Sequence, residues 1–135
     1  KDTIELTTVG SYVRKNGKCY VVYEDYKDSP QENKTLLSII KVQSPNLIII
    51  SNTGPLKSRL TLERNKRHYC RYETEFGPIT MGVYTRFINC DLKESSAEIN
   101  ILYYMDMNAD VTSINEISIS VKEKIKNVKC VNNVD

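Results

Sequence analysis

The segment HYCRYETEFGPITMGVYTRF, residues 68 to 87, places a histidine two positions before a cysteine. Nucleophilic enzymes make a reactive thiolate from such a pair, with the imidazole as the base. On a β-strand, however, His68 and Cys70 would lie about 7 Å apart at ~3.4 Å per residue. A direct thiolate–imidazole hydrogen bond needs about 2.6–3.2 Å. We therefore expect a buried Cys70, a hydrogen-bonded His68 and no catalytic constellation, so the protein is not predicted to be an enzyme.

Two further patterns could bind metal, and neither fits. Residues 106–110 begin like a calcium loop, D-x-N-x-D, but Val111 stands where the loop needs glycine and Ile117 where it needs glutamate. The four cysteines lack the close pairs of a zinc site and are predicted to be reduced thiols. They are Cys19, Cys70, Cys90 and Cys130. We expect no metal and no cofactor.

The remaining sequence predicts the elements that would position these residues. Apolar and polar side chains alternate in short runs separated by turn-forming residues, which is typical of half-buried β-strands. The nine predicted strands cover residues 3–13, 18–26, 34–42, 46–51, 57–63, 68–75, 79–88, 97–106 and 113–124. We predict one all-β domain over residues 1–135, with little or no helix. An antiparallel β-barrel of about eight to ten strands is favoured because closure removes the exposed strand edges.

Within this fold, residues 68–87 are predicted to form a β-hairpin. Gly77-Pro78 is the expected two-residue loop, since glycine supplies the positive φ of a type II′ turn. One face of the hairpin would then hold apolar and small polar side chains, and the other would hold charged ones. The predicted inner partners are Phe76 with Ile79, Thr74 with Met81, Tyr72 with Val83, Cys70 with Thr85, and His68 with Phe87.

The inward face of this hairpin defines the first candidate site. A barrel of this size has room for packed side chains or for one small ligand. A few polar groups in an apolar lining are typical of small-molecule sites, although the same groups could simply fill the interior. The candidate lining residues are His68, Tyr72, Thr74, Met81, Thr85 and Tyr103. The first functional hypothesis is therefore a non-enzymatic barrel that binds a small, partly apolar ligand.

The outward face defines the second candidate site. Residues 57–71 carry six basic side chains against Glu63 alone, and the candidate basic surface consists of Arg59, Arg67, Arg71 and Arg86. Such a surface suits a protein partner, or a single-stranded nucleic acid whose bases stack on aromatic rings. The net charge of only +2 disfavours nucleic acid. An interaction module using these strands is the alternative hypothesis.

The sequence bounds the other partners. No apolar run approaches the ~18 residues of a membrane-spanning helix, so no membrane partner is expected. Composition is ordinary for a globular chain, with 40% hydrophobic and 27% charged residues. It leaves self-association into a homo-oligomer open.

Three segments resemble the YwiB-like family: TVGSYVRKNGKCYVVYED, NTGPLKSRLTLERNKRHY and, most specifically, YETEFGPITMGVYT. These are small bacterial proteins, common in Firmicutes, that carry a calycin- or lipocalin-like β-barrel and have no established function. The similarity runs from about residue 8 to about residue 124. It implies a lipocalin-like (calycin-like) barrel and a bacterial, cytoplasmic setting, and it carries over no catalytic residues.

Two departures from the family pattern matter. Family members usually carry one more strand ahead of the one that begins at Thr3 here. The barrel would then be completed by residues outside this sequence, closed with fewer strands, or completed by the C-terminal tail, residues 125–135. The family also often has an arginine two residues before the glycine equivalent to Gly54, where this chain has Asn52. If that arginine contacts a ligand, this protein lacks the contact.

Overall fold

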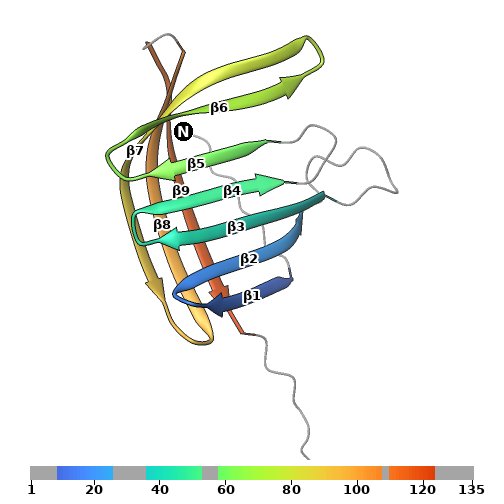
Figure 1. Ribbon diagram of the computed structural model, residues 1–135, viewed down its shortest axis with the longest axis vertical. Helices are drawn as coiled ribbons and strands as arrows, with labels where there is room; N and C mark the ends of the chain where they lie inside the picture. The colour runs from blue at the N-terminus through green and yellow to red at the C-terminus, as the bar shows by residue number, and fades with distance from the viewer. Residues whose placement is uncertain (1–8, 26–35, 53–57, 108–109, 124–135) are drawn as a thin grey trace, which may run out of the picture.

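The structure is a computed structural model that describes residues 9–25, 36–52, 58–107 and 110–123 (Figure 1). Every helix or strand in this part of the chain is a β-strand, which confirms the all-β prediction. The nine strands are β1 (Gly10–Lys15), β2 (Lys18–Asp25), β3 (Leu36–Ser44), β4 (Leu47–Asn52), β5 (Arg59–Glu63), β6 (Arg67–Thr74), β7 (Gly77–Leu92), β8 (Ser96–Met107) and β9 (Asp110–Lys122). The tail at 125–135 lies outside the described residues.

The strands form two antiparallel sheets, each a simple meander. One has the order β1-β2-β3-β4-β5 and the other β6-β7-β8-β9. Figure 1 shows the shorter strands of the first sheet crossing in front of the long strands β7, β8 and β9. Closure of these sheets into a single barrel stays a prediction.

The two sheets meet at a corner between β5 and β6. Arg64 forms an isolated bridge with Thr85 of β7, and the backbone N–H of Asn65 donates to the Thr85 carbonyl at 2.7 Å. The Arg64 guanidinium donates to the Ile88 carbonyl at 3.0 Å. Backbone and side-chain hydrogen bonds therefore hold the turn of the first sheet against the second.

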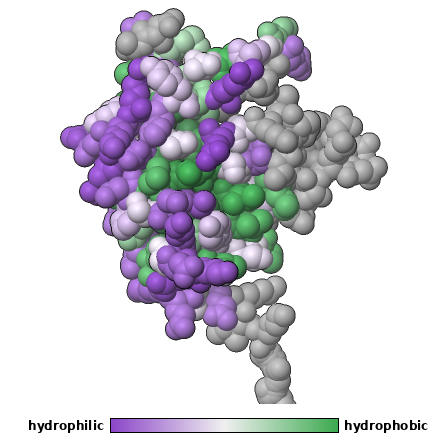
Figure 2. Space-filling model, in the orientation of Figure 1, coloured by the Kyte–Doolittle hydropathy of each residue, from purple (hydrophilic) through white to green (hydrophobic). Residues whose placement is uncertain are grey.

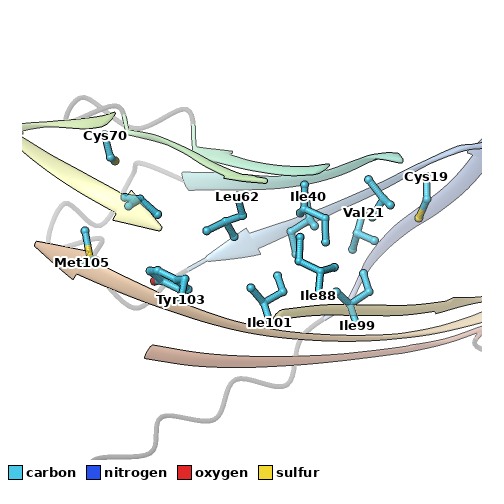
Figure 3. Close-up of a cluster of buried hydrophobic side chains, with 13 residues drawn as sticks. Cys19, Val21, Ile40, Leu62, Cys70, Ile88, Ile99, Ile101, Tyr103 and Met105 are labelled. Atoms are coloured by element: carbon cyan, nitrogen blue, oxygen red, sulfur yellow. The ribbon is translucent and has the colours of Figure 1, made fainter. Parts of the chain in front are cut away.

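The hydrophobic core lies between the facing sides of the two sheets. In Figure 3 the side chains of Val21, Ile40 and Leu62 point toward those of Ile99 and Ile101. Strand β8 follows strict alternation over most of its length, because every second residue faces this core. Leu62 and Ile99 have no exposed surface, and burying such a side chain contributes about 1.5–3 kcal/mol.

The predicted register of the β6–β7 hairpin is wrong by four residues. Thr74 pairs with Gly77, so the loop is Glu75-Phe76, and Cys70 pairs with Met81. Pro78 therefore lies inside a strand, which is tolerated because β7 pairs with β8 only from Gly82 onward. A slip of four is even, so Cys70 and Met81 keep their predicted inner face, but Phe76, which was predicted to face inward, lies in the loop and is 96% exposed.

A β-bulge in β7 makes one further pair of the predicted hairpin wrong. The register of β7 against β8 shifts between Thr85 and Phe87. Phe87 is consequently 44% exposed on the outer side, while Ile88 is buried. The predicted inward pairing of Phe87 with His68 is wrong, since His68 pairs with Val83.

Candidate functional site

The inward candidate residues lie at the end of the core nearest the β5–β6 corner. Thr85 is fully buried beside Tyr103, its partner on β8. Among the described residues, no donor or acceptor pairs with Thr85 Oγ1. Burial raises the pKa of the Tyr103 phenol, and the nearby Cys70 thiol raises it further. Met81 is half-buried and packs against the same cluster.

His68 and Cys70 both make contacts with β5. The His68 ring nitrogen Nε2 lies 2.8 Å from Glu63 Oε1, and Cys70 Sγ donates to the Arg59 carbonyl at 3.2 Å. The hydrogen bond from His68, with help from Lys66 at 3.4 Å, lowers the pKa of the Glu63 carboxyl. As predicted, His68 is hydrogen-bonded and Cys70 is buried; together they join the two sheets.

The last two inward candidates, Tyr72 and Thr74, lie on β6. Their backbones pair with Ile79 and Gly77 of β7. Their side chains lie outside the described part of the structure. The predicted inward lining is thus brought together by the fold at Met81, Thr85 and Tyr103, whereas His68 points to β5.

The four basic candidates divide into separate groups. Arg59 and Arg71 line one depression on the outer surface. Arg86 is exposed at the bulge of β7. Arg67 lies on the outer face of the second sheet, where it forms an ion pair with Asp106 of β8. The structure therefore does not present the four arginines as one basic track.

The ion pair of Arg67 crosses β7 at a glycine. Arg67 Nε lies 3.2 Å from Asp106 Oδ2, its second nitrogen contacts Oδ1, and its guanidinium carbon stands 4.9 Å from the centre of the Tyr69 ring. A Cβ atom on Gly82 would clash with the Arg67 guanidinium and would lie 2.6 Å from Asp106 Oδ1. Gly82 therefore provides the space in which the pair forms.

The depression beside Arg59 and Arg71 has a volume of about 480 Å³ and lies on the outer face of β3, β4 and β5. Its apolar floor consists of Ile39 and Ile49, which are half-buried. Figure 2 shows apolar surface gathered over these strands, with hydrophilic side chains around it. The described lining residues are Ile39, Lys41, Ile49, Ser51, Asn52, Ser58, Arg59 and Arg71.

Strand pairing brings this lining together. Ile39 pairs with Ser51, and Ser51 pairs with Arg59, so one row crosses three strands. The neighbouring row places Lys41 opposite Ile49, with the Lys41 ammonium 5.7 Å from the centre of the Tyr20 ring. The described lining therefore carries three cationic side chains around two isoleucines, with no carboxylate among its residues.

Asn52 shapes one end of the depression. Its Nδ2 donates to Ser58 Oγ at 3.0 Å, and its Oδ1 accepts from the Ser58 backbone N–H at 3.3 Å. This position, where the resembling family often has arginine, thus fastens the end of β4 to the start of β5. Substitution at residue 52 would change the lining directly.

Sequence reasoning found Arg59 and Arg71 but missed the apolar floor. The runs SIIKV at 38–42 and LIIIS at 47–51 break strict alternation by placing isoleucine on both faces of a strand. Neighbouring apolar residues on a face predicted to be solvated are a signal for a contact surface. Ile39 and Ile49 carry that signal.

Comparison with known proteins identifies the family. The profile of a domain of unknown function, DUF1934, matches residues 1–119. The chain belongs to this family. The crystal structure of the ywiB protein from Bacillus subtilis superposes on this chain with a TM-score of 0.67 at 23% sequence identity. The match covers 85% of this chain and 75% of that one, and it shows a shared fold. The YwiB-like resemblance is confirmed.

The family assignment supplies no activity. Among curated proteins, none matches the sequence significantly. In the part of the chain that the structure describes, no helix is long and apolar enough to cross a membrane. The candidate function is therefore argued from the site itself.

Proposed function

We propose that this protein is a non-enzymatic binding protein for a small, partly apolar anion, held in the outer depression over β3, β4 and β5. The observation that carries the proposal is the apolar floor of Ile39 and Ile49 between Lys41, Arg59 and Arg71. Small-molecule sites combine a mostly apolar lining with a few polar groups that set orientation.

The charge of the lining favours a carboxylate or phosphate over a neutral ligand. A guanidinium presents donors in a planar fork that matches either group, and the three cations of the lining give the depression a positive field. The isoleucine floor would take an acyl chain or ring, since burying apolar surface yields about 25 cal/mol per Å². The ligand is therefore expected to be amphipathic.

A second position for such a ligand is the interior beside Thr85 and Tyr103, the site predicted from the hairpin. The specific observation in its favour is the buried Thr85 hydroxyl, which has no partner among the described residues. A polar ligand group or a water molecule at this point would satisfy it. This is the lesser candidate, because the neighbouring side chains are already buried in the hydrophobic core.

Interaction with single-stranded nucleic acid through the basic strands is the remaining alternative. It receives less support because Asp106 balances the charge of Arg67, one of the four candidate arginines. An electrostatic track along phosphates needs several cations in succession. A short single-stranded oligonucleotide is therefore included among the ligands to be titrated, so that the alternative is tested directly.

Isothermal titration calorimetry with octanoate tests the proposal, with acetate and octyl glucoside as the charged and apolar halves of the probe. Octanoate should bind more tightly than either comparator. The double variant Arg59→Gln/Arg71→Gln and the single variant Ile49→Ser should each weaken octanoate binding about tenfold, equivalent to about 1.4 kcal/mol.

Arg14→Gln is the matched control, because it removes an exposed arginine of β1 that does not line the depression. Unchanged octanoate affinity in the double variant would refute the outer site. If Thr85→Val abolished binding instead, the ligand would belong to the interior. Tighter, steeply salt-dependent binding of a short single-stranded oligonucleotide would favour the nucleic-acid alternative.

A further inference from the structure

The outer face of the sheet β6–β9 changes character halfway along its strands. At the end near the β7–β8 turn it is polar: Ser118 donates to Asn100 at 2.8 Å, and Ser120 donates to Glu98 at 2.7 Å. Toward the other end the same face becomes apolar and aromatic. Its members are Tyr69, Tyr84, Phe87, Leu102, Tyr104, Val111 and Ile114, which we name the aromatic face.

The aromatic face is open to solvent. Ile114 and Tyr69 are each 66% exposed and Val111 is 61% exposed, and the rings of Tyr84 and Tyr104 stack at 6.4 Å. Contiguous apolar surface of this kind on a folded chain indicates an interaction site. The boundary with the hydrogen-bonded polar half shows that the apolar character is confined to one patch.

The charges inside the aromatic face are already paired. Asp106 lies under the guanidinium of Arg67, in the space that Gly82 leaves. A partner can cover a bidentate pair of this kind without burying an uncompensated charge, since each group keeps its hydrogen bonds. The patch is therefore suited to a partner that is itself largely apolar.

We propose that the partner is a second copy of this chain, packed face to face about a two-fold axis parallel to β8. Oppositely charged residues on the two sides of the patch favour a second copy as the partner. Phe87 pairs with Leu102, and Leu102 pairs with Glu116, so Arg86 and Glu116 flank one row of the patch on opposite sides. The two-fold axis places β7 of one copy over β9 of the other.

This arrangement is complementary in charge and brings apolar residues together. Arg86 of each copy meets Glu116 of its partner, which gives two equivalent ion pairs at the rim. Tyr84 meets Ile114 of the partner, because both pair with Tyr104 within one sheet. Each contact occurs twice, as an isologous interface requires.

The size of the patch sets the expected affinity. Under this axis β7, β8 and β9 overlap with strands of the partner, whereas β6 lies beyond the overlap. Three strands at about 4.8 Å spacing and six residues of β8 at about 3.4 Å cover roughly 300 Å² of flat area per copy. The total for two copies, roughly 600 Å² before side-chain relief is counted, places the contact among weak, transient interfaces, which bury less than about 1,200 Å². We therefore expect a weak, reversible dimer with a dissociation constant of about 100 μM or higher.

Sedimentation equilibrium of the full chain from about 1 μM to about 1 mM tests the proposal. The wild type should shift from monomer to dimer across this range. Ile114→Glu should weaken dimerisation at least tenfold, because it buries a carboxylate in the centre of the contact. Val13→Glu, at a 51% exposed position on β1, is the matched control and should leave the dimer intact.

Charge reversal tests the two-fold arrangement. Arg86→Glu and Glu116→Arg should each weaken the dimer, and the double variant should restore it. A monomer at every concentration would overturn the proposal and would assign the face to a different protein partner. A dimer unaffected by Ile114→Glu, or a double variant that fails to restore association, would overturn it as well.

Discussion

At the scale of single residues, the absence of a side chain at Gly82 explains the most specific contact on the outer surface. The guanidinium of Arg67 lies across β7 at Gly82 and reaches Asp106, 39 residues further along the chain. The atoms that a Gly82 Cβ would meet are the ends of flexible side chains. An alanine there would therefore displace the ion pair rather than strain the backbone.

A double-mutant cycle tests this account. Gly82→Ala and Arg67→Met should each lower the free energy of unfolding, since each breaks the ion pair between Arg67 and the mostly buried Asp106 carboxylate. In the Arg67→Met background, Gly82→Ala should have little further effect, because the pair is already lost. Urea unfolding of the wild type, the two single variants and the double variant gives the coupling free energy between residues 67 and 82. Additive losses of stability in the double variant would show that Gly82 stabilises the protein independently of the Arg67–Asp106 pair.

Thr85 gives the second residue-scale prediction. Its hydroxyl is buried without a partner among the described residues, and valine has nearly the same shape. Thr85→Val should raise the free energy of unfolding by about 1 kcal/mol, since it removes an unsatisfied polar group. Thr85→Ser, which keeps the hydroxyl, is the control and should not stabilise. Destabilisation by valine would indicate that a ligand or water normally satisfies the hydroxyl.

At the scale of elements, the β6–β7 hairpin depends on Gly77. This residue has φ = 110°, a conformation that other residues rarely adopt, and it begins β7 directly after the loop. The Asn16-Gly17 turn between β1 and β2 uses the same chemistry, with positive φ at both residues as a type I′ turn requires. Both loops connect neighbouring strands, so their geometry is largely local.

Gly77→Ala should therefore destabilise the protein by about 1–3 kcal/mol, the cost of holding a non-glycine residue at such a φ. Thr80→Ala, an exposed change on the same strand, should stay within about 0.5 kcal/mol of the wild type. Thermal unfolding followed by circular dichroism measures both. Equal stability of Gly77→Ala and the wild type would contradict the observed loop.

At the scale of the whole molecule, side chains from β5 and β6 join the two sheets. His68 reaches Glu63, and Cys70 reaches the backbone of Arg59. The hydrogen bond from His68 holds the pKa of Glu63 below its ordinary value of 4.5. Ionised Glu63 therefore stabilises the folded state above pH 4.5, and this stabilisation is lost as the pH falls through the folded-state pKa.

Acid unfolding tests the contribution of this contact. The wild type should lose more stability between neutral pH and about pH 3 than Glu63→Gln, which cannot ionise. Glu123→Gln, a change at an exposed glutamate away from the corner, should follow the wild-type curve. Parallel curves for the wild type and Glu63→Gln would show that the corner contact has no role in stability.

For the inward candidate residues, the sequence predicted burial but not strand register. Alternation correctly assigned Cys70, Thr85 and Tyr103 to the buried face, because a period of two is a local property of any strand. It could not give the register of the hairpin. The position of Pro78 in β7 depends on where β8 ends alongside it, and β8 is distant in the sequence.

The outer depression was predicted only through its arginines. Arg59 and Arg71 belong to a basic segment that is visible in the sequence, whereas Ile39, Lys41 and Ile49 come from two other strands. Their common face follows from the pairing of β3, β4 and β5. Strand order brings together residues that are far apart in the sequence and share no local pattern.

The sequence by itself determined the all-β class, most strand positions and the face on which most side chains lie. These follow from side-chain alternation and turn chemistry, which act over a few residues. Only the tertiary structure decided which faces meet, how the two sheets join at the β5–β6 corner, and that Arg67 reaches Asp106 across Gly82. Such contacts depend on the packing of strands far apart in the chain, where no local periodicity specifies the partner.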